Sequence, residues 1–185
     1  MTVVTISRQM GSMGLEVGQA AARRLNYRMV CREVINQAAL QAGVPEAALA
    51  AIDELGLLGL KLKREETARY LAAVHAIVTD LAGAGNVVIV GRAGQVILRG
   101  RAGVVHVRVI APLELRIERI MEWKKVNRET AGRLVQHSDR ARAAYLRKNY
   151  QTRVDDPGLY DVVISTGRLS LDQAAELVCA LCEAG

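Results

Sequence analysis

The spacing of hydrophobic residues changes several times along the chain, and each change predicts a new element of secondary structure. Short runs of β-branched and apolar residues predict buried strands, whereas a spacing of three to four residues predicts helices with one apolar face. The predicted strands are 3–6, 27–30, 86–90, 104–110 and 161–165. The predicted helices are 14–25, 32–42, 45–53, 64–82, 93–98, 112–126, 128–149 and one that begins after Ser170.

The predicted strands indicate the fold class. The segment 86–90 reads NVVIV, so its apolar side chains must be covered on both faces, as in a parallel sheet. Helices alternate with such strands, which predicts a three-layer α/β/α fold with a mainly parallel, five-stranded sheet. The chain has 185 residues and no internal repeat or linker, so we expect residues 1–185 to form a single domain.

A polar, glycine-bearing loop follows the first strand, where residues 7–14 read SRQMGSMG. A loop between a strand and a helix N-terminus binds phosphate through its free N–H groups and the helix dipole. The loop departs from the Walker pattern Gly-x-x-x-x-Gly-Lys-Ser/Thr, because Leu15 stands at the lysine position and Glu16 at the hydroxyl position. The predicted phosphate-binding residues are Ser7, Arg8, Gln9, Gly11, Ser12, Met13, Gly14, Leu15 and Glu16.

Arginines follow several other predicted strands. Ligands collect at the carboxyl ends of parallel strands, and these ends carry Arg8, Arg92 and Arg168. The helix after the fourth strand adds Arg116 and Arg119, which lie on one face at i,i+3. Arginine stays charged and forms bidentate bonds with phosphate, so the joint pattern predicts an anion site at this edge of the sheet.

The segment 124–153 is rich in basic residues, and two interpretations of it remain open. One is a basic lid that closes over nucleotide phosphates, and the other is a stripe that binds nucleic acid. Only Tyr145 and Tyr150 are nearby for stacking on bases, which favours the lid. The basic residues are Lys124, Lys125, Arg128, Arg133, Arg140, Arg142, Arg147, Lys148 and Arg153.

The composition narrows the class of protein. Aromatic residues make up 3% of the chain and Phe is absent, so the core must be aliphatic. The net charge of +6 favours anionic partners. No apolar run approaches the ~20 residues of a membrane span, and three cysteines are too few for a disulfide framework. We therefore expect a cytoplasmic protein with no membrane partner.

Two further features each have two interpretations. Cys179 and Cys182 form a lone CxxC inside the last predicted helix, which is typical of a buried helix face rather than of a zinc or redox site. The hydrophobic segment 55–62 reads LGLLGLKL and is either a packed connector or a surface that binds a partner protein. A homo-oligomer would form through this segment or through the predicted helix 64–82.

The chain resembles the cytidylate kinase-like branch of the nucleoside monophosphate kinases. The resemblance rests on TISRQMGSMG, VIVGRAGQVIL, HVRVIAPLELRIERIM, SDRARAAYLRKNY and DPGLYDVVISTGRLSLDQAAELV, which follow the family's order. The last two blocks are the most specific, since Asp139-x-x-Arg142 precedes an apolar strand and then Leu169-Ser170. The resemblance implies a P-loop kinase fold with a core at 1–30, 86–126 and 160–185. It also implies a helical insert that binds the monophosphate, at about 31–85, and a basic helical lid, at about 120–155.

The resemblance further implies ligands and residue roles. ATP–Mg²⁺ would lie on the loop, and Arg32, Arg92, Asp139 and Arg142 would hold the acceptor. Arg116 and Arg119 fall on the family's lid arginines. Four residues depart from the pattern: Leu15, Glu16, Cys31 and Ala93. Cys31 stands where the kinase-like branch often shows an acidic residue, and Ala93 stands where cytidylate kinases have an aspartate.

The departures in the loop shape the functional prediction. Neutralising charge in the transition state is most of phosphoryl-transfer catalysis, so we predict that Arg8 replaces the missing lysine. The predicted catalytic residues are Arg8, Arg116, Arg119 and Arg140. Glu16 is the candidate for binding Mg²⁺ directly or through water.

Three functional hypotheses follow from these predictions. The first is ATP-dependent phosphoryl transfer to a nucleoside monophosphate, with an acceptor such as CMP. The second is a nucleotide-binding sensor or regulatory protein of the same fold that has lost catalysis. The third and least favoured is a basic module that binds nucleic acid.

Overall fold

The computed structural model describes residues 2–41, 43–44 and 64–183 of the chain. Its centre is a five-stranded sheet in the order β2-β3-β1-β4-β5, and every pairing between these strands is parallel. The strands are β1 (Val3–Arg8), β2 (Arg28–Val30), β3 (Val87–Val90), β4 (Val104–Ile110) and β5 (Val162–Ser165). The predicted fold class is therefore confirmed.

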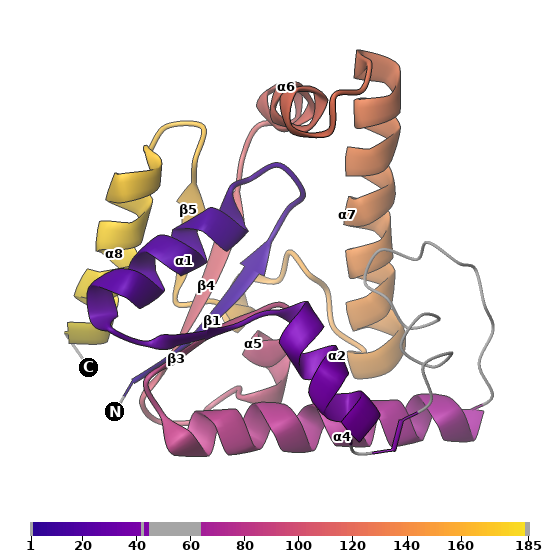
Figure 1. Ribbon diagram of the computed structural model, residues 1–185, viewed down its shortest axis with the longest axis vertical. Helices are drawn as coiled ribbons and strands as arrows, with labels where there is room; N and C mark the ends of the chain where they lie inside the picture. Colours follow the sequence, from indigo (N-terminus) through magenta and orange to yellow (C-terminus); the bar gives the residue numbers. More distant parts are fainter. Residues whose placement is uncertain (1, 42, 45–63, 184–185) are drawn as a thin grey trace.

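Helices cover both faces of the sheet, which makes three layers (Figure 1). One face carries α1 (Gly14–Leu25) and α8 (Leu171–Glu183), which pack on alternate strand residues such as Val4, Ile6 and Val107. The other face carries α2 (Arg32–Gln41), α4 (Arg64–Ala84), α5 (Gly94–Ile97) and the end of α7 (Arg128–Tyr150). Side chains of a strand alternate between the two faces, so each face receives its own aliphatic core.

A third, smaller apolar cluster lies where α6 (Leu113–Lys124) meets the start of α7. It contains Ile117, Ile120, Ala131 and Val135. Helix α7 is therefore packed against α6 at its N-terminal end and against the main core at Tyr145 and Leu146. A short helical turn, η1 (Pro157–Leu159), leads the chain back to β5.

Most of the predicted elements are present within a few residues of their predicted bounds. The prediction at 45–53 and the segment 55–62 lie outside the described residues, and so does most of the link between α2 and α4. Cys179 and Cys182 pack into the layer of α8 and α1, as a buried helix face requires. Burial raises the pKa of Cys182 to about 11.

Among the described residues, no helix is both long enough and apolar enough to span a bilayer.

Candidate phosphate-binding site

The glycine loop connects β1 to α1 in a shape that close packing enforces. Gly11 has φ +78°, and a Cβ atom there would lie 2.7 Å from the backbone oxygen of Arg116. A Cβ atom on Gly14 would lie 2.4 Å from the Cβ atom of Arg8. Only glycine fits these two positions without a shift of the backbone. The buried hydroxyl of Ser12 donates to the carbonyl oxygens of Gln9 (2.9 Å) and Val109 (3.0 Å), which ties the loop to β4.

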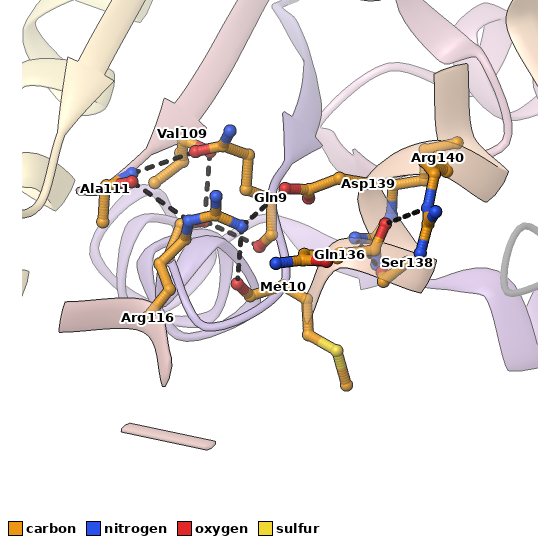
Figure 2. Close-up of polar contacts among 11 residues, drawn as sticks. Gln9, Met10, Val109, Ala111, Arg116, Gln136, Ser138, Asp139 and Arg140 are labelled. Atoms are coloured by element: carbon orange, nitrogen blue, oxygen red, sulfur yellow. Dashed lines mark hydrogen bonds and ion pairs between the residues drawn. The ribbon is translucent and has the colours of Figure 1, made fainter. Parts of the chain in front are cut away.

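Arg116 holds the loop from the side of α6. Its side chain is only 5% exposed, and its Nε atom donates to the carbonyl oxygen of Ala111 at 3.1 Å. Its Nη1 atom reaches the carbonyl oxygen of Met10 (3.4 Å) and the Oδ2 atom of Asp139 (2.8 Å). Figure 2 shows these contacts converging between the loop and α7. The ion pair therefore fixes the loop to the helix that carries most of the basic segment.

Arg119 holds the loop from the side of β5. Its Nη1 atom donates to the carbonyl oxygen of Gly11 (3.1 Å) and to the hydroxyl oxygen of Thr166 (3.0 Å). Its Nη2 atom donates to the carbonyl oxygen of Thr166 at 2.9 Å, and the Thr166 hydroxyl donates to the carbonyl oxygen of Ser12 at 2.9 Å. The structure thus brings Arg116 and Arg119 to the loop, where both guanidinium groups donate to backbone carbonyls.

A cavity of about 550 Å³ opens beside the loop, between the ends of β1 and β4 and helix α7. Six arginines and two aspartates line it, so its walls carry a net positive charge. Asp139 is already paired with Arg116, and hydrogen bonds from Arg153 lower the pKa of Asp155. The lining residues are Arg8, Gln9, Arg108, Asp139, Arg140, Arg142, Ala143, Arg147, Arg153, Val154 and Asp155. A concave surface with a net positive charge attracts small anions.

Arg108 lines this cavity although the sequence analysis did not single it out. It lies within β4, pairs in register with Ser7 of β1, and is 9% exposed. Its Nη1 atom donates to the hydroxyl oxygens of Ser7 (3.2 Å) and Tyr160 (3.3 Å). One signal in the sequence could have found it: His106 and Arg108 are two polar residues at alternate positions of an otherwise apolar strand.

A second, narrower cavity adjoins the first and shares Arg8, Arg142 and Val154 with it. Gly91, Ala93 and Gln95 contribute the wall at the end of β3. Arg142 donates to the Ser138 hydroxyl at 2.6 Å, so its side chain is held along α7.

Two of the predicted acceptor-binding arginines lie elsewhere. Arg92 is fully buried, donates to the Oδ1 atom of Asn36 at 2.6 Å, and lies over the ring of Tyr70. Arg32 begins α2 and pairs with the adjacent Glu33 at 2.9 Å. Neither arginine is among the described residues that line the two cavities.

The two unusual residues of the loop face outward. Leu15 is 39% exposed in the first turn of α1, and Glu16 is exposed beside it. Neither residue lines the cavities within the described part of the chain. Residues 2–41, 43–44 and 64–183 contain no cluster of three or more His, Cys, Asp or Glu residues that could hold a metal ion.

Comparison with protein families gives a match over residues 3–168, which covers the loop, the cavity and the whole of α7. The chain belongs to the Cytidylate kinase-like family. The matched region ends at Arg168, two residues beyond the Thr166 that holds the loop.

Solved structures similar to this chain share its fold. A structure described as an uncharacterized protein from Eubacterium ventriosum ATCC 27560 is 18% identical and superposes with a TM-score of 0.80, with all of both chains covered. A gluconokinase from Sinorhizobium meliloti 1021 is 18% identical with a TM-score of 0.59, over 99% of this chain and 94% of that one. A shikimate kinase from Acinetobacter baumannii, in complex with shikimate, is 13% identical with a TM-score of 0.56, over 100% and 94%. At these identities the likeness shows a P-loop kinase fold.

One curated relative matches part of the chain. It is named Uronate isomerase, from Corynebacterium glutamicum, and is 30% identical over 101 residues, or 55% of this chain. The chain spans about a fifth of that protein's length, 19%. The match is therefore local.

Proposed function

We propose that this protein is an ATP-dependent kinase that transfers a phosphoryl group to a nucleoside monophosphate, with CMP or a similar molecule as acceptor. The observation that carries the proposal is the cavity of about 550 Å³ beside the glycine loop, which six arginines line. Membership of the Cytidylate kinase-like family supports the same reaction class. Two phosphorylated substrates that react with each other need a site with this excess of positive charge.

The proposed reaction needs positioning and charge stabilisation rather than a covalent intermediate. An oxygen atom of the acceptor's phosphate attacks the γ-phosphorus of ATP, and a new bond between that oxygen and phosphorus forms. The bond between the γ-phosphorus and the β,γ-bridging oxygen breaks, and ADP leaves with the electron pair. The attacking oxygen belongs to a phosphate that is largely ionised near pH 7, so no side chain has to remove a proton.

Two sets of arginines would share the work in this proposal. Arg8 and Arg140 line the cavity and would stabilise the transferred group, whereas Arg116 and Arg119 would act through the loop that they hold. Asp139 and Arg142 would contact the acceptor from α7, since both also line the cavity. Arg32 would act from the monophosphate-binding insert at about 31–85 and Arg92 from the turn after β3, and α7 would form part of the lid at about 120–155.

The described residues that line the cavity include only two carboxylates, Asp139 and Asp155, so Mg²⁺ would bind there together with the nucleotide. The family of P-loop kinases generally uses ATP with Mg²⁺, which keeps several waters and binds through phosphate oxygens and one or two carboxylates. Asp139 is a lining carboxylate that is linked to the loop, because Arg116 donates hydrogen bonds both to its Oδ2 atom and to the carbonyl oxygen of Met10. Glu16 would have to bind through water from the first turn of α1. The ion would supply positive charge to the phosphate chain.

A second candidate function is a nucleotide-binding sensor or regulatory protein of the same fold. The observation that favours it is Leu15, which brings an apolar side chain to the position of the Walker lysine. Under this alternative, the cavity would bind the nucleotide without turning it over.

A coupled assay of ADP release with CMP, UMP, AMP and GMP, alongside thermal unfolding with ATP, separates the two candidates. We expect turnover with at least one pyrimidine monophosphate, and a fall of about 10²-fold in kcat/KM for Arg8→Ala. Arg99→Ala is the matched control, because Arg99 is exposed and lies outside the cavity lining. No turnover with any monophosphate, together with stabilisation by ATP, would favour the sensor. An unchanged response of Arg8→Ala to ATP would contradict the role of Arg8.

A further inference from the structure

Arg108 differs from the buried Arg116 because no carboxylate forms an ion pair with it within the described residues; the carboxylate of Asp155, which Arg153 already pairs, acts on it only at longer range. Its side chain is more than nine-tenths buried in β4. Its guanidinium donates to the hydroxyl oxygens of Ser7 and Tyr160, and its central carbon lies 5.5 Å from the centre of the Tyr160 ring. All of these partners are electrically neutral.

A buried guanidinium without a counter-ion is costly, since burial removes its hydration. The two carboxylates that share its cavity are paired with other arginines: Asp139 is 2.8 Å from Arg116, and Asp155 is 2.9 Å from Arg153 and adds only a longer-range attraction to Arg108. A hydroxyl and an aromatic face offset only part of the cost. The charge of Arg108 is therefore directed at something that enters the cavity.

The position of Arg108 fits an anion that the glycine loop holds. Its register partner is Ser7, the residue next to the end of β1, and the loop begins two residues later. Both residues lie in the interior of a sheet whose neighbouring strands fix them. Leu15 brings no charge to the phosphates from the helix side of the loop.

We propose that Arg108 is a phosphate-binding residue, and that the charge a Walker loop takes from its lysine comes here from the neighbouring strand β4. The ligand is a phosphate chain, such as the triphosphate of a nucleotide. Only the identity of the ligand rests on the proposed kinase activity, because an inorganic polyphosphate would bind the same guanidinium. Arg8 lines the same cavity and would contribute a second positive charge.

Tyr160 is the positioning residue for this guanidinium. Its hydroxyl donates to the carbonyl oxygen of Val154 at 2.8 Å and accepts from the Nη1 atom of Arg108 at 3.3 Å. Tyr160→Phe removes the hydroxyl and keeps the ring beneath the cation. We expect it to weaken binding only a few-fold, less than any neutral replacement of Arg108.

The test is calorimetric titration of the full chain with inorganic tripolyphosphate, and separately with ATP. Arg108→Met should weaken tripolyphosphate binding by about 10- to 100-fold, the usual effect of losing a charged hydrogen bond. Arg99→Met removes the same charge from an exposed position outside the cavity and should bind within about two-fold of wild type. Arg108→Gln keeps donors towards Ser7 and Tyr160 without the charge, and it decides the question if Arg108→Met does not fold.

A second readout is the stability of the ligand-free protein. Removing a buried charge that lacks a counter-ion should leave the thermal midpoint of Arg108→Met unchanged or raise it, whereas a purely structural arginine would lower it. Equal binding of tripolyphosphate by wild type and Arg108→Gln would overturn the inference, even if the protein proves to be a kinase. Loss of binding in that variant, in a protein without turnover, would support the phosphate site and contradict the proposed kinase activity.

Discussion

Arg116 and Arg119 contact the glycine loop, whereas Arg108 lines the cavity beside it. The charges of these two groups of arginines have different partners. Arg116 and Arg119 donate to the loop carbonyls of Met10 and Gly11, and Arg116 has a carboxylate partner in Asp139. Within the described residues, Arg108 donates its hydrogen bonds to hydroxyl groups, lies over an aromatic ring and forms no ion pair. The first group completes the structure of the loop, whereas Arg108 is the residue that we propose binds an anion.

The comparison shows that the role of a guanidinium near the glycine loop depends on the partners that it already has within the protein. A cation whose hydrogen bonds end on backbone oxygens has little left to offer a ligand, so its removal should act through the loop. A cation held by neutral groups at the wall of a cavity can be removed without disturbing the loop. The two groups should therefore separate in stability measurements and in binding measurements.

The largest effect should come from breaking the contact between the loop and α6. Gly11→Ala would force a Cβ atom to within 2.7 Å of the Arg116 backbone oxygen at a φ of +78°. Left-handed strain and overpacking together should lower the free energy of unfolding by about 3 kcal/mol in a urea titration.

A matched glycine separates the two causes. Gly100 has φ +73°, and nothing lies within 4 Å of the Cβ atom that alanine would add. Gly100→Ala should cost about 1 kcal/mol from strain alone. Equal losses in the two variants would mean that packing of the loop on Arg116 contributes nothing to stability.

The next effect tests whether Asp139 neutralises Arg116. Asp139→Asn leaves a guanidinium that is 5% exposed without its ion pair, and should lower the free energy of unfolding by about 2 kcal/mol. The control is Asp172→Asn, which breaks an exposed pair with Arg24 and should cost less than about 0.5 kcal/mol. The double variant Arg116→Met with Asp139→Asn should recover part of the loss. Additive losses in the double variant would show that the two groups are not coupled.

The smallest expected effect is a pH dependence of stability that comes from His106. Unlike Arg108, this buried base can lose its charge. His106 lies two residues earlier on the same strand face, and burial lowers its pKa although the carboxylate of Asp161 opposes the change. Its ring nitrogen contacts the Thr5 hydroxyl at 2.7 Å. Because the unfolded chain binds the proton more tightly, stability should be full above pH 6.5 and fall as the pH drops below it.

Urea titrations between pH 5 and 8 measure this dependence. The slope from one group cannot exceed about 1.4 kcal/mol per pH unit. His106→Asn keeps a hydrogen-bonding group near Thr5 and should flatten the curve below pH 6.5. A wild-type curve that rises towards acid pH would contradict a lowered pKa.

The sequence predicted the fold well because hydrophobic spacing reports local geometry. The bounds predicted for α1 and β4 are those observed, at Gly14–Leu25 and Val104–Ile110. In both, the apolar pattern changes abruptly at the ends, where Gly14 follows a polar loop and Pro112 follows a strand. The strands predicted at 27–30, 86–90 and 161–165 each begin one residue later than predicted, as β2, β3 and β5.

The candidate site was predicted less completely, because a sequence does not tell where a side chain is directed. Arg92 follows a strand as the phosphate ligands of parallel sheets do, yet its backbone has φ +51° and its side chain is buried against Asn36. Arg116 and Arg119 reach the predicted loop, but the carbonyls that receive them depend on the loop's own shape. Arg108 was hidden inside a strand, where a charged residue is usually at an edge.

The end of α6 has a consequence for spectroscopy. Trp123 is the single tryptophan of the chain, and its ring is 72% exposed with the Lys124 ammonium 4.6 Å from its centre. The same helix carries Arg116 and Arg119, which hold the loop. The protein thus contains an intrinsic fluorophore on the helix that holds its glycine loop, so intensity or polarisation of its emission can follow movements of α6 without any label.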